Sequence, residues 1–154
     1  MKDPEEPLGK VVVRTDEGVI KGYCDALPYV SIADVFRSTR RSLSEVLAVR
    51  QAATQIATEI DLRDAKAVFF VKHFDGQSQR KDLRFHGPSV SNGIWVEVGF
   101  SDGECLEGIV ENAVHVLLQP GFFLVPTDPG SNNRLIYVLK HAVHTFRVLG
   151  LRQF

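Results

Sequence analysis

The sequence predicts a mainly β protein made of two tandem small β-barrel modules that are related by internal duplication. The first observation is a repeated segment, because DEGVIKG at residues 16–22 recurs as DGECLEG at residues 102–108. The second observation is that each copy follows a run in which apolar and polar residues alternate, the pattern of a half-buried strand. The third is a glycine that occupies the same place in both copies.

Each repeated segment predicts a β-hairpin. In the first copy, a strand at residues 10–15 reaches a turn at residues 16–18, and residues 19–23 return antiparallel. Gly22 lies inside the returning strand, where glycine is unfavourable unless the strand bulges or bends sharply. Gly108 stands at the matched position of the second copy. These matched glycines favour a shared small-barrel architecture.

The stretch after the first hairpin departs from the second copy. Apolar residues at residues 42–57 recur at spacings of three and four, and Ser42 with Glu45 matches a capping box. We therefore predict an amphipathic helix at about residues 42–57, inserted into the first module. The alternative is a hairpin that uses residues 46–49 and 54–62, because valine, threonine and isoleucine suit strands.

The chain divides into a disordered lead-in at residues 1–8, a first module at 9–74, a linker at 75–93 and a second module at 94–150. The linker is marked by its glycine, serine and charged residues. Residues 67–71 are five apolar residues in succession, which predicts a strand buried on both faces between the modules. Five short strands with a tight turn before the last predict that the second module is an SH3-like or Sm-like barrel, with an open meander as the alternative.

Two motifs resemble the hallmarks of an uncharacterised bacterial domain family. They are KAVFFVK at residues 66–72 and the segment at residues 121–133, which contains GFFL, a proline, DP and SNN. The resemblance extends over residues 9–149 and implies a shared fold. It also implies a regulatory context, because such domains occur beside regulatory domains in longer proteins. The stretch at residues 39–58 is longer than the family usually carries. No mechanism follows from the resemblance.

A looser similarity is to Sm-like RNA-binding proteins. The segments that carry it are Val98 with the turn at residues 102–108, and residues 136–138 with Val143 and Phe146. The RNA-reading positions differ, because residues 140–142 are Lys-His-Ala rather than an arginine–glycine pair. The similarity therefore implies a barrel and does not imply RNA binding.

The composition is that of an ordinary globular protein. The chain has 154 residues, 44% of them hydrophobic and 24% charged, with a formal net charge of -1. This balance gives no overall attraction to nucleic acid or anionic lipid. With no apolar run of 18 residues and no secretory signal, we expect a cytoplasmic protein with no membrane partner. Cys24 and Cys105 form no CxxC pair, and we expect buried free thiols.

No catalytic or metal-binding pattern is present. The sequence lacks GxSxG, HExxH and P-loop motifs, and its five histidines have no zinc-site spacing. We therefore expect no enzyme activity, no metal and no cofactor.

Arg37, Arg40 and Arg41 form a basic cluster that could bind phosphate, because guanidinium groups match phosphate geometry. The spacing of Arg37 and Arg41 resembles the start of PilZ domains, which bind cyclic dinucleotides, but the D/NxSxxG segment of those domains is missing. The cluster therefore predicts a ligand site for a nucleotide or RNA, or else a solvated charged face.

Two segments are candidate interfaces. The polar loop at residues 126–133 contains the first set: Asp128, Ser131, Asn132 and Asn133. Val116, Leu117 and Leu118 form the second set, which either extends a strand into the core or makes an exposed patch that a partner covers. The sequence thus predicts a non-enzymatic interaction or assembly module in a bacterial regulatory context. The partner is another protein or a second copy of the chain, and a phosphate-bearing ligand at the arginines is the alternative.

Overall fold

The computed structural model describes residues 9–24, 43–75, 93–128 and 130–152. These residues form ten strands, two 3₁₀ turns and one short helix: β1 (Lys10–Thr15), β2 (Gly18–Tyr23), β3 (Val46–Gln51), β4 (Ala57–Asp61), η1 (Leu62–Asp64), β5 (Ala65–Val71), β6 (Gly93–Phe100), β7 (Cys105–Glu111), α2 (His115–Leu118), β8 (Gly121–Pro126), β9 (Asn133–Leu139), η2 (Lys140–Ala142) and β10 (Val143–Arg152). The fold is mainly β, as the sequence predicted. The predicted lead-in at residues 1–8 lies outside the described residues.

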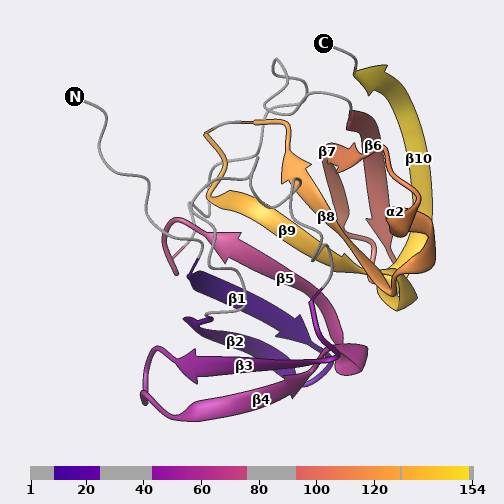
Figure 1. Cartoon of the computed structure of the whole chain (residues 1–154). Helices are drawn as coiled ribbons and strands as arrows, with labels where there is room; N and C mark the ends of the chain where they lie inside the picture. Colours follow the sequence, from indigo (N-terminus) through magenta and orange to yellow (C-terminus); the bar gives the residue numbers. More distant parts are fainter. Residues whose placement is uncertain (1–8, 25–42, 76–92, 129, 153–154) are drawn as a thin grey trace.

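All ten strands belong to one antiparallel sheet, in the order β10-β6-β7-β8-β9-β5-β1-β2-β3-β4. The first half of the chain (β1–β5) and the second half (β6–β10) each form one continuous block of this sheet. In each block the fifth strand pairs with the first, and the second, third and fourth strands follow in sequence order. A 3₁₀ turn separates the fourth strand from the fifth in both halves. The halves join where β5 pairs with β9 (Figure 1).

The registers of the two first hairpins match the sequence repeat. Val11 lies opposite Gly22 in the first half, and Val96 lies opposite Gly108 in the second. A Cβ atom on Gly22 would overlap a backbone oxygen of β3, and one on Gly108 would overlap a backbone oxygen of β8. Both glycines therefore permit the same close approach of the third strand of each half.

The predicted helix at residues 42–57 is wrong. Residues 46–51 of this stretch form β3 and residue 57 begins β4; the two strands pair as a hairpin, so the alternative interpretation of the sequence is confirmed. Leu47 and Val49 are buried while their neighbours in β3 are exposed, which is the two-residue period of a strand. The hairpin turn passes through Gln55, whose φ is 60°. Pairing of β3 with its neighbours outweighs the local capping-box pattern.

The sheet has an apolar core on each face. In β5, Val68 and Phe70 belong to the first core, whereas Ala67, Phe69 and Val71 belong to the second. Because successive side chains of a strand point to opposite faces, the two cores lie on opposite sides of β5. Strands β8 and β9 also contribute to both cores. This arrangement confirms the prediction that residues 67–71 form a doubly buried strand between the two halves.

Candidate functional site

The segment before β8 exposes large apolar side chains. Strand β7 ends at Glu111, and the short helix α2 follows. Leu117 and Leu118 of α2 are 79% and 75% exposed, whereas Val116 packs against the second core. Of the two interpretations of residues 116–118, the structure therefore supports the exposed patch, with Val116 as its anchor.

Strand β10 adds to this patch. Phe146 lies opposite Val98 and Val148 lies opposite Val96, so both face the second core. They are nevertheless 45% and 56% exposed. Phe146 contacts the core edge-on through Phe122, with ring centres 5.6 Å apart. We name the exposed apolar side chains of residues 114–118 and of β10 the apolar rim: Val114, Leu117, Leu118, Phe146, Val148 and Leu151.

Sequence reasoning missed the contribution of β10 to the apolar rim. Phe146 and Val148 have the alternating pattern of a core strand. The equivalent side chains of β5, Val68 and Phe70, are indeed buried in the first core. The difference arises because β9 flanks β5 on its second edge, whereas β10 has no such neighbour among the described strands.

The polar loop at residues 126–133 uses its side chains to hold itself together. Asp128 and Ser131 are buried. The Asp128 carboxylate accepts a hydrogen bond from the Gly130 N–H, and the Ser131 hydroxyl oxygen accepts one from the Asn133 N–H. Of the four residues predicted from this loop, Asn132 and Asn133 are the two with partly exposed side chains.

Asn132 ties the loop to the end of β5. Its side-chain oxygen accepts a hydrogen bond from the His73 N–H at 3.0 Å, and its amide nitrogen donates one to the His73 carbonyl at 2.9 Å. This bidentate contact reproduces the pairing of two strands, and it extends the joint between β5 and β9 by one step. The contact holds the loop against the sheet, so the Asn132 side chain has a structural role.

Lys66 on β5 connects the two halves electrostatically. Its ammonium group lies 2.7 Å from the Asp102 carboxylate and also binds Glu104, both beside the β6–β7 turn. The same group lies 4.4 Å from the centre of the Phe100 ring, and Arg14 binds Glu104 at 2.6 Å. The hydrogen bond from Lys66 lowers the pKa of Asp102. Acidic residues of the second half therefore meet basic residues of the first.

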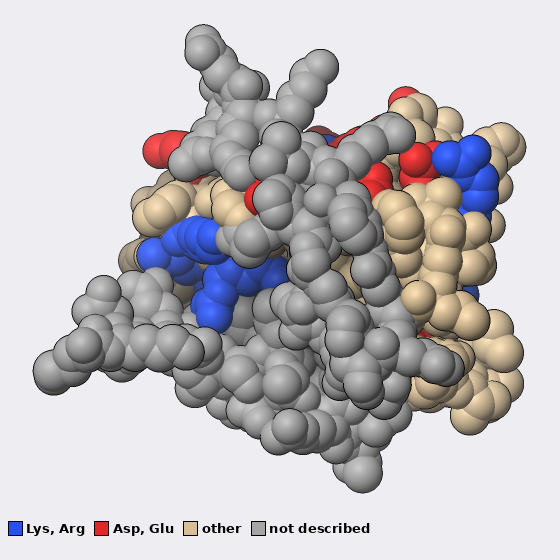
Figure 2. All heavy atoms as spheres, turned by 90° about the horizontal axis from the view of Figure 1, so that it is seen from above, with Lys and Arg blue, Asp and Glu red and all other residues tan. Residues whose placement is uncertain are grey.

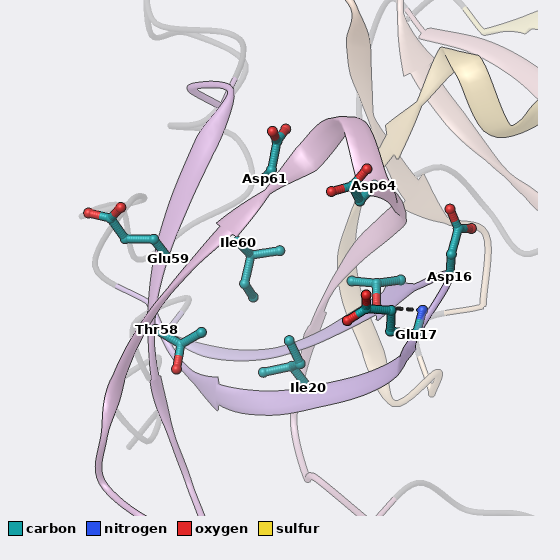
Figure 3. A pocket seen from close by; sticks show the side chains of 9 residues that line it. Asp16, Glu17, Ile20, Thr58, Glu59, Ile60, Asp61 and Asp64 are labelled. Atoms are coloured by element: carbon teal, nitrogen blue, oxygen red, sulfur yellow. Dashed lines mark hydrogen bonds between the residues drawn. The ribbon is translucent and has the colours of Figure 1, made fainter.

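The first half contains an acidic hollow of about 370 Å³ between the β1–β2 turn and β4. Ile20 and Ile60 point toward one another inside it (Figure 3). The carboxylates that line it are Asp16, Glu17, Glu59, Asp61 and Asp64. Arg63 binds Asp61 at 2.6 Å, and this hydrogen bond lowers the pKa of Asp61 to about 2. No set of three or more metal-ligating side chains converges within the described residues.

The predicted arginine cluster, Arg37, Arg40 and Arg41, lies outside the described residues. The described part of the chain has basic and aromatic side chains at the end of β2, where the Arg50 guanidinium lies 4.9 Å from the centre of the Tyr23 ring. Tyr23 in turn meets the Phe74 ring edge-on, with centres 5.3 Å apart. Figure 2 shows one group of lysine and arginine side chains toward the left of this face and another near its upper right edge.

The cysteines differ in environment. Cys24 is buried, as predicted, but Cys105 is exposed, so that prediction is wrong for Cys105. Cys105 is the first residue of β7 and lies beside the β6–β7 turn, where its side chain is exposed to solvent.

These observations define a mainly β protein with one continuous antiparallel sheet and an exposed apolar rim. The chain belongs to the family of unknown function DUF6982, whose model matches residues 8–150. This membership confirms the resemblance to a domain family of unknown function. No curated protein and no solved structure matches the chain. Among the described residues, no helix has the length and apolar character needed to cross a membrane.

Proposed function

We propose that this protein is a non-enzymatic interaction or assembly module that acts in a bacterial regulatory context in the cytoplasm. The apolar rim carries this proposal. Large apolar side chains of residues 114–118 and of β10 remain exposed, and each segment contacts the second core, through Val116 and through Phe146. Exposed apolar surface of this kind is typical of a site that another protein covers, and Leu117 and Leu118 are its most exposed side chains.

The local structure of α2 supports a preformed site. The N–H groups of Val116 and Leu117 donate to the carbonyls of Ala113 and Val114, and these bonds fix the turn that presents the leucines. A partner that covers Leu117 and Leu118 would therefore not have to order the segment first, which lowers the cost of binding.

We further propose that the two halves are SH3/Sm-like modules derived by duplication. The equal strand order, the equal hairpin register and the matched glycines support this origin. The 3₁₀ turn before each fifth strand supports it as well.

The test is capture of partner proteins on the immobilised chain, comparing wild type with Leu117→Ser/Leu118→Ser. Val19→Ser is the matched control, because Val19 is an exposed apolar side chain outside the apolar rim. We expect at least one protein to be retained by wild type and by the control and to be lost from the double variant. Identical sets of retained proteins for all three would contradict the proposal.

A phosphate-bearing ligand, either a cyclic dinucleotide or RNA, is the second candidate. Support comes from Tyr23 at the end of β2 and Arg50 opposite it on β3, since in the sequence the segment that carries Arg37, Arg40 and Arg41 lies between these two strands. Guanidinium groups beside an aromatic ring suit phosphate and base together. A thermal-shift panel of these ligands at low and high salt tests it. The expected result is a salt-sensitive shift that Arg37→Ala/Arg41→Ala removes, and no shift with any ligand would exclude this candidate.

A further inference from the structure

The two outer strands of the sheet each have an edge without a partner strand in the part of the chain that the structure describes. β4 pairs with β3 and β10 pairs with β6, at opposite ends of the sheet (Figure 1). Such edges expose backbone groups that can bind a further strand. Their charges are complementary, because β10 contains two arginines, a histidine and no acid, whereas β4 contains Glu59, Asp61 and no base.

The joint inside the chain shows how a fifth strand of one half fits a fourth strand of the other. Ala67 of β5 lies opposite Val138 of β9, and Phe69 lies opposite Ile136. All four side chains belong to the second core. Side chains of β5 therefore complete the core of the second half beside β9.

The corresponding groove of the first half is the acidic hollow. Thr58 and Ile60 of β4 lie four and two residues before η1. Ile136 and Val138 of β9 lie four and two residues before η2, so the two pairs correspond. Thr58 and Ile60 both line the hollow, so the hollow occupies the place that β5 fills in the second half. A fifth strand from elsewhere would fit here.

Strand β10 carries the side chain that suits this place. Phe69 lies opposite Val12 of β1, and Arg147 lies opposite Glu97 of β6. Val12 and Glu97 occupy the same position in the two repeated hairpins, so Phe69 and Arg147 correspond. In the second half, Phe69 enters an apolar groove. In the first half the groove is bordered by carboxylates, and Arg147 supplies the opposite charge. Arg147 is exposed and lies 3.3 Å from Glu97. This surface ion pair contributes little to stability, so Arg147 can exchange Glu97 for another carboxylate.

Lys66 and His144 form a second matched pair. Each residue has no opposite residue in the neighbouring strand, because the pairing register shifts there. The shift occurs at Lys66 where β5 pairs with β1, and at His144 where β10 pairs with β6. Lys66 binds the acids at residues 102–104 beside the turn of the second half. The corresponding turn of the first half contains acids at residues 16–17, and these border the hollow. His144 of another copy would lie beside them.

We propose that this protein assembles head to tail, with β10 of one copy pairing antiparallel with β4 of a second copy. Arg147 then enters the acidic hollow of the second copy, and Phe146 lies opposite its Glu59. The inference rests on the proposed function as an assembly module and names a second copy as the partner. Symmetric pairing of β10 with β10 is disfavoured, because it brings two basic strands together.

Head-to-tail pairing also covers part of the apolar rim. In the internal joint, Val68 and Phe70 of β5 are buried with side chains of β8 and β9. In the proposed contact, Phe146 and Val148 of β10 take their places over the β3–β4 hairpin. The small exposed side chains of Ala48 and Ala57 leave room for them. The contact is heterologous, so it builds a ring or a filament according to the rotation between copies.

Sedimentation velocity and light scattering on the full chain test this proposal against the 17.2 kDa monomer. Arg147→Glu alters the β10 side of the contact, and Asp16→Lys/Asp64→Lys alters the hollow side. Lys21→Glu is the control, because it reverses an exposed charge on neither edge strand. Wild type and control should form species larger than the monomer, and each edge variant should associate at least about tenfold more weakly.

Mixing the two edge variants gives the decisive result. The hollow of Arg147→Glu and the β10 of Asp16→Lys/Asp64→Lys are both intact, and the two altered surfaces again carry opposite charges, so the mixture should form larger species than either variant alone. A monomeric wild type, or a mixture that stays monomeric, would overturn head-to-tail assembly. Capture of a partner that depends on Leu117 and Leu118 would still support the proposed function in that case, so the two failures are distinguishable.

Discussion

The ammonium of Lys66 and the carboxylate of Asp102 are 36 residues apart in the sequence and lie 2.7 Å apart across the joint between the two halves. The Lys66 side chain is 13% exposed, whereas the Asp102 side chain is 56% exposed, so water screens the contact from the Asp102 side. Lys66 therefore holds the hairpin of the second half against β5 at the point where the sheet continues from one half to the other.

Replacing this charge should weaken the whole sheet. Lys66→Met keeps the length and apolar stem of the side chain but removes the contacts with Asp102, Glu104 and the Phe100 ring. We expect the free energy of unfolding to fall by about 1–2 kcal/mol, measured by urea denaturation. Lys21→Met removes an exposed ion pair with Asp75 and should change stability by less than about 0.5 kcal/mol. Equal effects of both changes would contradict the role of Lys66.

The Asp61 carboxylate predicts a change of stability in acid. Its pKa is lowered to about 2 in the folded protein, chiefly by the hydrogen bond from Arg63, whereas the ordinary value is 3.8. A lowered folded pKa contributes stability above the unfolded pKa, and this contribution is lost as the pH falls from about 4 toward 2. Urea midpoints measured across this range should fall less steeply for Asp61→Asn. Arg63→Gln should have the same effect, and a wild-type slope in both variants would refute the assignment.

Gly108 and Gly22 are positions at which an added methyl group should be poorly tolerated. Gly108→Ala places a Cβ against the side chain of Leu124 and the backbone of Val125, and Gly22→Ala makes the equivalent overlap with β3. Each should lower the free energy of unfolding by about 1–3 kcal/mol, since a backbone contact cannot yield as a flexible side chain does. Gly150→Ala is the control, because its Cβ would meet only the Trp95 ring, at 3.4 Å. Thermal unfolding of the three variants measures the difference.

Removing the Tyr137 hydroxyl by Tyr137→Phe should be tolerated in the core. Tyr137 is almost fully buried, and burial raises the pKa of its hydroxyl. The Leu43 backbone acts on the pKa in the opposite direction, but no described residue meets this hydroxyl with hydrogen-bond geometry. Tyr137→Phe should therefore leave stability unchanged or raise it by up to about 1 kcal/mol in urea denaturation. A loss of more than about 1 kcal/mol would reveal a bonded hydroxyl.

Much of the fold could be predicted because it depends on local patterns. The hairpin that follows Val11 and Val13 and the doubly buried strand at residues 67–71 were both readable from residue alternation and turn chemistry. Residues 42–57 were misread, because short apolar spacings fit a helix as well as a strand. Pairing with β2 and β4, which a sequence pattern does not contain, decided in favour of the strand.

The candidate site was predicted less completely. Exposure of Leu117 and Leu118 was one of two open interpretations, and Asp128 and Ser131 turned out to be buried within their own loop. Phe146 was not suspected, because an apolar residue in an alternating strand is normally buried. Whether it is covered depends on the neighbour of β10 in the sheet, and that neighbour is set by sheet order.

The sequence by itself determined the mainly β class, the repeated hairpin with Gly22 and Gly108, and the membership of a domain family. These depend on residue identity and spacing, which act over a few neighbouring residues. Only the tertiary structure decided that β5 pairs with β9, that the cores lie on opposite faces, and that β4 and β10 are the outer strands among those described. Those features depend on which distant strands share hydrogen bonds, and alternation of residues is the same for an inner strand and an edge strand.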